Sequence, residues 1–327
     1  MKFEVSRVPL DMKLALKKFD AEADNLVASF ISPIEAVPPP PLVYNYTNDI
    51  GLRGILESGK LWLSDIFSLN DPTELSHGFS HVIKILREKA TYGLPETKLF
   101  AEHVEAVQTQ GGIRAAAHYF VCSFSAAGDD LGQWRAYADN GRGYALGFNA
   151  KMLEAAYTHD GAAPITNNST FPITYDDVKL IELHRELVDK MFPLISLPRG
   201  RGLTSAAIRD FMRELSTILS THALRTALFF KHEAYKNETE YRFLEIHRGD
   251  RDPPKVKFRG RPDSLIKYRE FDWRGTNALA LEEIVIGPAA NKDQAYQIAT
   301  DCLKAFNCKM IEPVHSRIPY RASSSLE

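Results

Sequence analysis

The most informative chemical signal in the sequence is the segment ETEYR, which runs from Glu238 to Arg242. Residues 240–247 are rich in strand formers. On one strand Glu238, Glu240 and Arg242 would share a face, because side chains alternate with a period of two. Two carboxylates on one face can stabilise a developing cation or accept a proton. The alternative is a solvated strand on which Arg242 pairs with a glutamate, and the spacing alone favours that alternative.

Two further segments combine hydroxyl or amide groups with aromatic rings. They are YNYT (Tyr44–Thr47) and CSFS (Cys122–Ser125), and both are predicted to be strands. Such a mixture can hold a ribose or a flat ring, because aromatic faces stack while short polar groups form hydrogen bonds. A half-buried strand without a ligand is the usual alternative. Trp134 would share a helix face with Tyr137, an arrangement that more often belongs to a core than to a cofactor contact.

One cluster of basic residues, interleaved with aromatic rings, precedes the last predicted strand. It could follow a phosphate backbone, although a solvated hairpin face is the commoner explanation. The chain has 40 basic and 42 acidic residues, so its net charge of −2 excludes a broad positive field, and any contact with nucleic acid would be local. The cluster consists of Lys255, Lys257, Arg259, Arg261, Lys267 and Arg269, with Phe258 and Tyr268 between them.

The remaining composition excludes several classes of protein. With 327 residues, 44% of them hydrophobic, the chain can bury a core of its own. Its three cysteines lack CxxC spacing and its ten histidines lack metal-ligand spacing, so we expect neither a disulfide framework nor a metal site. No apolar run reaches the roughly 18 residues of a membrane span, and we expect a cytoplasmic protein without a membrane partner. The common phosphate-loop, dinucleotide, zinc-protease and serine-hydrolase motifs are absent.

The elements that position these residues follow an α+β order, with helices between the first strands and a helical block before the last three. We predict an N-terminal helix and proline-rich lead-in over residues 1–42, and a single α+β domain over 43–320. Helical periodicity predicts an insertion of two or three helices over about 177–235, and a disordered tail or expression scar is expected over 321–327. Strands are expected at 43–47, 61–64, 118–125, 141–148, 171–175, 240–247, 255–258 and 283–287, and further helices at 49–59, 73–89, 101–116, 129–138 and 293–306.

Six segments, taken in order, resemble the bacterial DUF2971 family of uncharacterised proteins. That family is distantly similar to the ADP-ribosyltransferase superfamily, whose members carry three motifs on strands. The first is an arginine or histidine that holds NAD, the second a Ser-Thr-Ser-like triplet, and the third Glu-x-Glu or Gln-x-Glu. The resemblance implies an ADP-ribosyltransferase-like split β-sheet core with a helical insertion. The six segments are YNYT (44–47), GILESGKLWLS (54–64), LNDPTE (69–74), CSFS (122–125), QWRAYADNGRGYALGF (133–148) and FKHEAYKNETEYRF (230–243).

The resemblance also implies roles for individual residues, with NAD as a substrate. Glu240 would face the developing ribose cation, and Glu238 would orient or deprotonate the acceptor. The chain departs from the motifs at two positions, because Asn45 stands where histidine or arginine is expected and Phe124 replaces the middle threonine. The implied NAD-binding residues are Tyr44, Asn45, Tyr46, Thr47, Ser123, Phe124, Ser125, Trp134, Tyr137 and Arg242.

Three functions follow as hypotheses. The first is an NAD-dependent ADP-ribosyltransferase that modifies a macromolecular acceptor, protein or nucleic acid, as in toxin or phage-defence proteins of that superfamily. The second is a non-catalytic module that binds a nucleotide or a partner protein on the same fold. The third is a metal-assisted nucleic-acid hydrolase, which would recruit DNA or RNA through the segment from Lys255 to Arg269.

Overall fold

A computed structural model describes residues 7–68, 74–91, 95–109, 117–160, 166–248, 255–261, 264–275 and 279–321. Asn70-Asp71-Pro72, whose residue types predict a turn, lies outside these residues, as does the predicted tail from residue 322 onward. The chain divides into two compact units. We call Met1–Ala36, Asn70–Ala117 and Thr174–Glu233 the helical unit, and Val37–Leu69, His118–Ile173 and Ala234–Glu327 the sheet unit.

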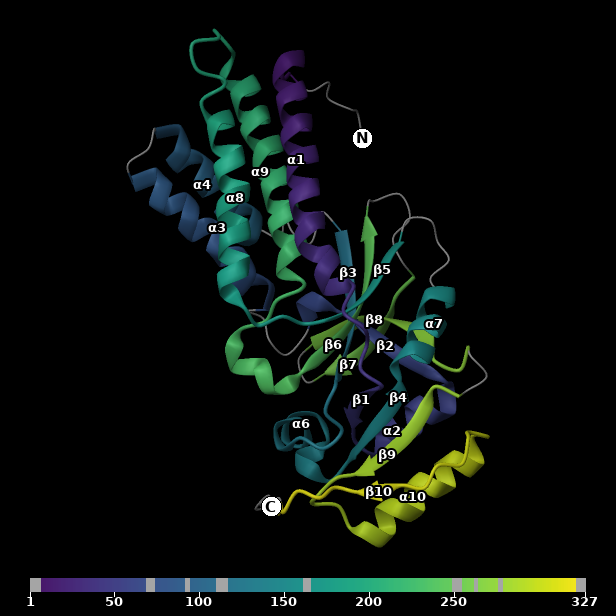
Figure 1. Cartoon of the computed structure of the whole chain (residues 1–327). Coiled ribbons are helices and arrows are strands. Elements are labelled where there is room, and N and C mark those ends of the chain that lie inside the picture. The colour runs from purple at the N-terminus through teal and green to yellow at the C-terminus, as the bar shows by residue number, and fades with distance from the viewer. Residues whose placement is uncertain are drawn as a thin grey trace. The chain divides into compact units, whose positions relative to one another are not determined.

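In the helical unit, long helices pack along one another, and Figure 1 shows α1, α8 and α9 running side by side. Helix α1 buries one residue every three or four positions from Met12 to Ile31, which is the stripe expected for a helix with one buried face. Two helices, α8 and α9, confirm the helical periodicity predicted over 177–235. The helices of this unit are α1 (Leu10–Glu35), α3 (Glu74–Thr91), α4 (Pro95–Thr109), α8 (Asp177–Ile195) and α9 (Ser205–Ala227).

The sheet unit contains a mostly antiparallel sheet in the order β10-β9-β4-β1-β3-β2-β8-β7, with β6 paired to β3 and β5 (Figure 1). Among the described strand pairings, only the short β10 runs parallel to its neighbour, β9. This architecture confirms the predicted α+β class. The strands are β1 (Leu42–Thr47), β2 (Lys60–Asp65), β3 (Ala117–Ser125), β4 (Tyr144–Asn149), β5 (Thr166–Pro172), β6 (Glu240–Arg248), β7 (Lys257–Arg261), β8 (Ser264–Asp272), β9 (Leu281–Ile286) and β10 (Val314–His315).

Among the described residues of the sheet unit, four α-helices follow its strands along the chain. In α2 the Asn48 side chain caps the first turn by accepting from the Gly51 N–H, and Gly59, with φ 66°, ends the helix as its sequence predicts. The other three are α6, α7 and α10, and the predicted helices near α2, α6 and α10 are thus confirmed, whereas α7 is an addition. The bounds are α2 (Asp49–Ser58), α6 (Leu131–Tyr137), α7 (Ala150–Asp160) and α10 (Lys292–Ala305).

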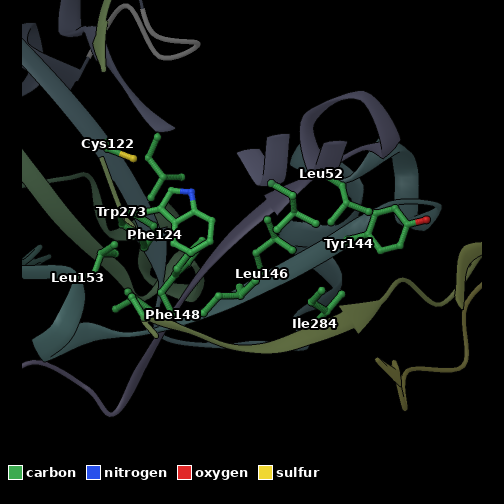
Figure 2. Close-up of a cluster of buried hydrophobic side chains, with 14 of the residues drawn as sticks. Leu52, Cys122, Phe124, Tyr144, Leu146, Phe148, Leu153, Trp273 and Ile284 are labelled. Carbon is green, nitrogen blue, oxygen red and sulfur yellow. The ribbon is translucent and has the colours of Figure 1, made fainter. Parts of the chain in front are cut away.

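One face of the sheet carries the largest aromatic core of this unit, part of which Figure 2 shows. Phe124 packs edge-on against Phe148, with ring centroids 6.3 Å apart, and against Phe243 at 5.1 Å. The Trp273 indole N–H donates to the Ile55 carbonyl oxygen of α2, so the buried ring keeps its hydrogen bond. Burial of these large rings supplies the main driving force for folding of this unit. Across the described residues, none of the helices is both long and apolar enough to cross a bilayer.

Candidate functional site

Strand pairing divides the residues of YNYT between two faces of the sheet. Tyr44 lies opposite Ser125 of β3, and residues opposite each other in an antiparallel pair point to the same face. Tyr44 and Tyr46 therefore share a face with Ser123 and Ser125, which we call the serine face. The other two residues, Asn45 and Thr47, alternate to the opposite side, where their partners on β4 belong to the aromatic core.

The serine face carries a buried glutamate, Glu240, that accepts hydrogen bonds from Ser123 and Arg242. The Ser123 hydroxyl donates to Glu240 Oε1 at 2.7 Å, and the Arg242 guanidinium reaches the same oxygen through Nε at 2.8 Å and Nη2 at 2.7 Å. Only 4% of Glu240 and 1% of Arg242 is exposed. A carboxylate this deeply buried requires a cation and hydrogen bonds to remain charged, and the site supplies both. The arginine pairing predicted as the alternative is present, but in a buried setting.

Glu238 is not on this strand, contrary to the prediction that it shares a face with Glu240. It ends the 3-10 helix η3 (Glu233–Glu238), and Thr239 adopts a left-handed φ of 42° before β6 begins. The Ser125 hydroxyl holds this turn by donating to the Glu238 carbonyl oxygen at 2.8 Å. The Tyr137 hydroxyl of α6 donates to Glu238 Oε1 at 3.3 Å. The two glutamates thus lie beside the two serines, one on the strand and one on the turn.

Helix α6 forms a wall beside the same face. Its Trp134 is fully buried and packs edge-on against Tyr46, with ring centroids 4.8 Å apart. The Tyr46 hydroxyl donates to the Ala127 carbonyl oxygen at 2.8 Å and accepts from the Asp130 N–H. Burial, the largest influence, raises the pKa of Tyr46 well above its usual value, so the phenol stays protonated. Trp134 and Tyr46 therefore support the site, whereas Tyr137 of the same helix is exposed.

Tyr44 is fixed between two glycines. A Cβ atom on either Gly128 or Gly147 would clash with the Tyr44 ring, so only glycine at these positions lets the backbone approach the ring this closely. The Tyr44 hydroxyl donates to Glu283 Oε2 at 2.6 Å. Burial first, and then the Glu283 carboxylate, raise the pKa of Tyr44, so this hydroxyl also remains a donor.

Asp129 connects the C-terminal segment to α6 through hydrogen bonds. Its Oδ1 accepts from the Trp134 indole N–H at 2.7 Å and from the Ser316 hydroxyl at 2.6 Å, while Oδ2 accepts from the Arg317 N–H at 2.8 Å. Sequence reasoning missed Asp129 and Glu283, because neither belongs to a motif. The local signal was the position of Asp129 as the first residue of the helix predicted over 129–138.

Of the remaining predicted residues, Phe124 lies on the aromatic face (Figure 2) and does not join the site. The basic cluster is divided by strand alternation. Lys257 pairs with Glu270 at 2.7 Å, and Arg269 donates to Glu245 at 2.8 Å on the opposite face. The Arg261 side chain lies outside the described residues. Within the described part of the chain, no group of three or more histidine, cysteine, aspartate or glutamate side chains is placed to hold a metal ion.

Comparison with known families gives one match. The family model described as "Protein of unknown function (DUF2971)" matches residues 133–243. This span begins in α6 and ends in β6, so it includes Trp134, Glu238 and Glu240 but not the YNYT strand or the two serines of β3. None of the curated proteins matches the chain, and none of the solved structures does.

Proposed function

We propose that this protein is an NAD-dependent ADP-ribosyltransferase with Glu240 as its central carboxylate. The observation that carries the proposal is the hydrogen bond from Ser123 to Glu240, which joins the second and third motif strands of the resemblance. Ser125 supports the proposal as well, because it holds the backbone that carries Glu238. The two tyrosines of the first motif strand lie on the same face.

The proposed reaction breaks the bond between the nicotinamide nitrogen and ribose C1′, and the electron pair leaves with nicotinamide. The ribose passes through an oxocarbenium-like state, which the negative charge of Glu240 would stabilise. Since Ser123 and Arg242 already hold this carboxylate, little reorganisation is needed as the cation develops. The acceptor nucleophile then forms the new bond to C1′ and gives its proton to Glu238, which is partly exposed and held by Tyr137.

A second candidate is a nucleotide-binding module without catalytic activity. The near-complete burial of Glu240 favours it, because a catalytic carboxylate must contact its substrate. The two candidates differ in whether NAD is consumed.

The test is to incubate the purified protein with NAD and follow nicotinamide release and labelled ADP-ribose on protein and nucleic-acid acceptors. We expect Glu240→Gln to lower nicotinamide release by about 100-fold or more. Glu238→Gln should reduce transfer to the acceptor more than it reduces hydrolysis of NAD, because only the transfer step uses its proton-accepting role. Near-ultraviolet circular dichroism verifies that each variant is folded. If the wild type consumes no NAD with any acceptor but binds it in a calorimetric titration, the binding module replaces the transferase.

A further inference from the structure

Trp62 is the exposed tryptophan of this chain. The sequence contains three tryptophans, and two of them, Trp134 and Trp273, are 0% exposed. Trp62 lies in the middle of β2 and is 41% exposed, although strand residues beside it are buried. A large aromatic ring that is exposed to solvent on a sheet indicates a candidate contact surface for a ligand.

The surroundings of Trp62 define what it can bind. The Tyr268 ring of β8 lies 4.5 Å from it, and the Arg259 guanidinium of β7 lies over it at 5.3 Å. Arg259 also donates to the Ser64 hydroxyl at 3.3 Å. Strand register fixes this cluster, because Ser64 pairs with Tyr268 on one side and with Val121 on the other. Aromatic rings and a guanidinium together favour a flat, electron-rich ligand.

The cluster faces the same way as the proposed catalytic residues. Val121 precedes Ser123 by two residues on β3, so Ser64, opposite Val121, belongs to the serine face. Trp62 is two residues from Ser64 on β2 and shares that face. A ligand bound at Trp62 would therefore lie on the side of the sheet that carries Ser123 and Glu240.

Charge complementarity indicates that this ligand is anionic. Residues 255–272 contain six basic and three acidic residues, although the chain as a whole has a net charge of −2. On the face of Trp62, Arg259 reaches the ring itself, and Lys255 is exposed where the hairpin begins, whereas the exposed Lys267 pairs with Phe258 and lies on the opposite face. Such a hairpin attracts phosphates, and the exposed Trp62 ring is available for stacking, whereas Tyr268 is only 8% exposed and holds the Trp62 ring in place.

We infer that Trp62, held by the buried Tyr268 and by Arg259, stacks on a nucleobase of a single-stranded nucleic acid whose phosphates contact the β7–β8 hairpin. A single strand is required, because the base faces in a duplex are already stacked on one another. This inference rests on the proposed function for its biological meaning, since it identifies the acceptor as a nucleic acid. The binding itself does not require NAD.

The test uses the full chain and a 12-nucleotide mixed-sequence single strand, as DNA and as RNA, without NAD. Trp62 dominates the solvent-accessible tryptophan fluorescence, so we expect saturable quenching that weakens as salt rises. With a fluorescein-labelled strand, anisotropy should show that Trp62→Ala weakens binding by about fivefold or more and that Trp62→Phe restores part of it. Phe258→Ala is the matched control, because Phe258 is an exposed ring of β7 that alternates to the face opposite Arg259.

Several outcomes overturn the inference. They are absence of quenching, equal quenching by adenosine monophosphate at the same nucleotide concentration, tighter binding of the matching duplex, and an effect of Phe258→Ala as large as that of Trp62→Ala. Capture of a peptide by Trp62 without any nucleic-acid binding would assign the surface to a protein partner instead. Because NAD is left out, this result is separate from the turnover assay: strand binding without NAD turnover would contradict the transferase alone.

Discussion

Strand β6 carries two buried glutamates, Glu240 and Glu245, on opposite faces of the sheet. Each contacts the residue two positions further along β6 and a residue on another strand. Glu240 contacts Arg242, two residues further along the strand, and Ser123 of β3. Glu245 contacts His247, again two residues along, at 2.7 Å, and Arg269 of β8 at 2.8 Å. The two sites differ in where the cation comes from. Glu240 has its arginine on its own strand and a neutral hydroxyl from a distant one, whereas Glu245 has its arginine on a distant strand.

This difference suggests different roles: Glu245 forms a structural ion pair, whereas Glu240 is a carboxylate held in one orientation. Burial raises the pKa of Glu245, but the hydrogen bonds from His247 and Arg269 outweigh it, and the pKa lies below its usual value. The Glu245 pair therefore connects two strands through charge. Ser123 of β3 adds a hydroxyl that orients the Glu240 carboxylate, while Arg242 on the same strand balances its charge. Both ion pairs contribute to stability, and we attribute chemistry to Glu240 alone.

The largest expected effect is on stability. Glu245→Gln leaves the partly buried Arg269 without its anion, so we expect the free energy of unfolding to fall by about 3 kcal/mol. Glu240→Gln also destabilises the fold, because Arg242 is buried, but it alone should abolish NAD turnover per folded molecule. Urea unfolding followed by circular dichroism measures the first quantity, and turnover corrected for the folded fraction measures the second. Equal loss of turnover in both variants would remove the proposed distinction.

Local sequence pattern located most elements that carry these two sites. Strand β6 begins at Glu240 as predicted, and α2 ends at its glycine. The sequence favoured a solvated hairpin face for the segment from Lys255 to Arg269 but assigned no strand to 264–272, and its charge pattern does not indicate that β8 pairs with β2 as well as with β7. The same charges include Arg269, so the ion pair with Glu245 could not be anticipated. It depends on a contact between strands 24 residues apart.

The site was predictable only in part. Alternation along one strand already places Tyr44 and Tyr46 opposite to Asn45, so the sequence contained enough information to divide that motif. The position of Glu238 did not follow from local pattern. Its turn is held by Ser125, which lies 113 residues earlier, and by the Ala126 N–H, which donates to the Thr239 carbonyl oxygen. A left-handed threonine arises from such long-range contacts rather than from local preference.

The second prediction concerns pH. Because the folded-state pKa of Glu245 is lowered, its contribution to stability is fully present above the unfolded value of about 4.5 and is lost as pH falls through the folded value. Glutamine does not titrate, so the stability difference between wild type and Glu245→Gln should shrink below about pH 4.5. Urea unfolding of both proteins at several pH values from about 3 to about 7, which lie below and above the unfolded pKa of Glu245, measures the difference. A difference that stays constant with pH would show that charge is not what Glu245 contributes.

The smallest expected effect tests the oriented carboxylate itself. Ser123→Ala removes the hydroxyl donated to Glu240 and leaves the ion pair with Arg242 in place. If the hydroxyl orients the carboxylate for the transition state, kcat for nicotinamide release should fall by about tenfold with little change in KM, which corresponds to about 1.4 kcal/mol. Ser125→Ala is the matched control, because Ser125 donates to the Glu238 backbone rather than to a carboxylate, and it should affect transfer to the acceptor more than NAD cleavage. A purely structural role for Ser123 would instead lower the unfolding free energy and leave kcat per folded molecule unchanged, which would place Glu240 with Glu245 as a second structural ion pair.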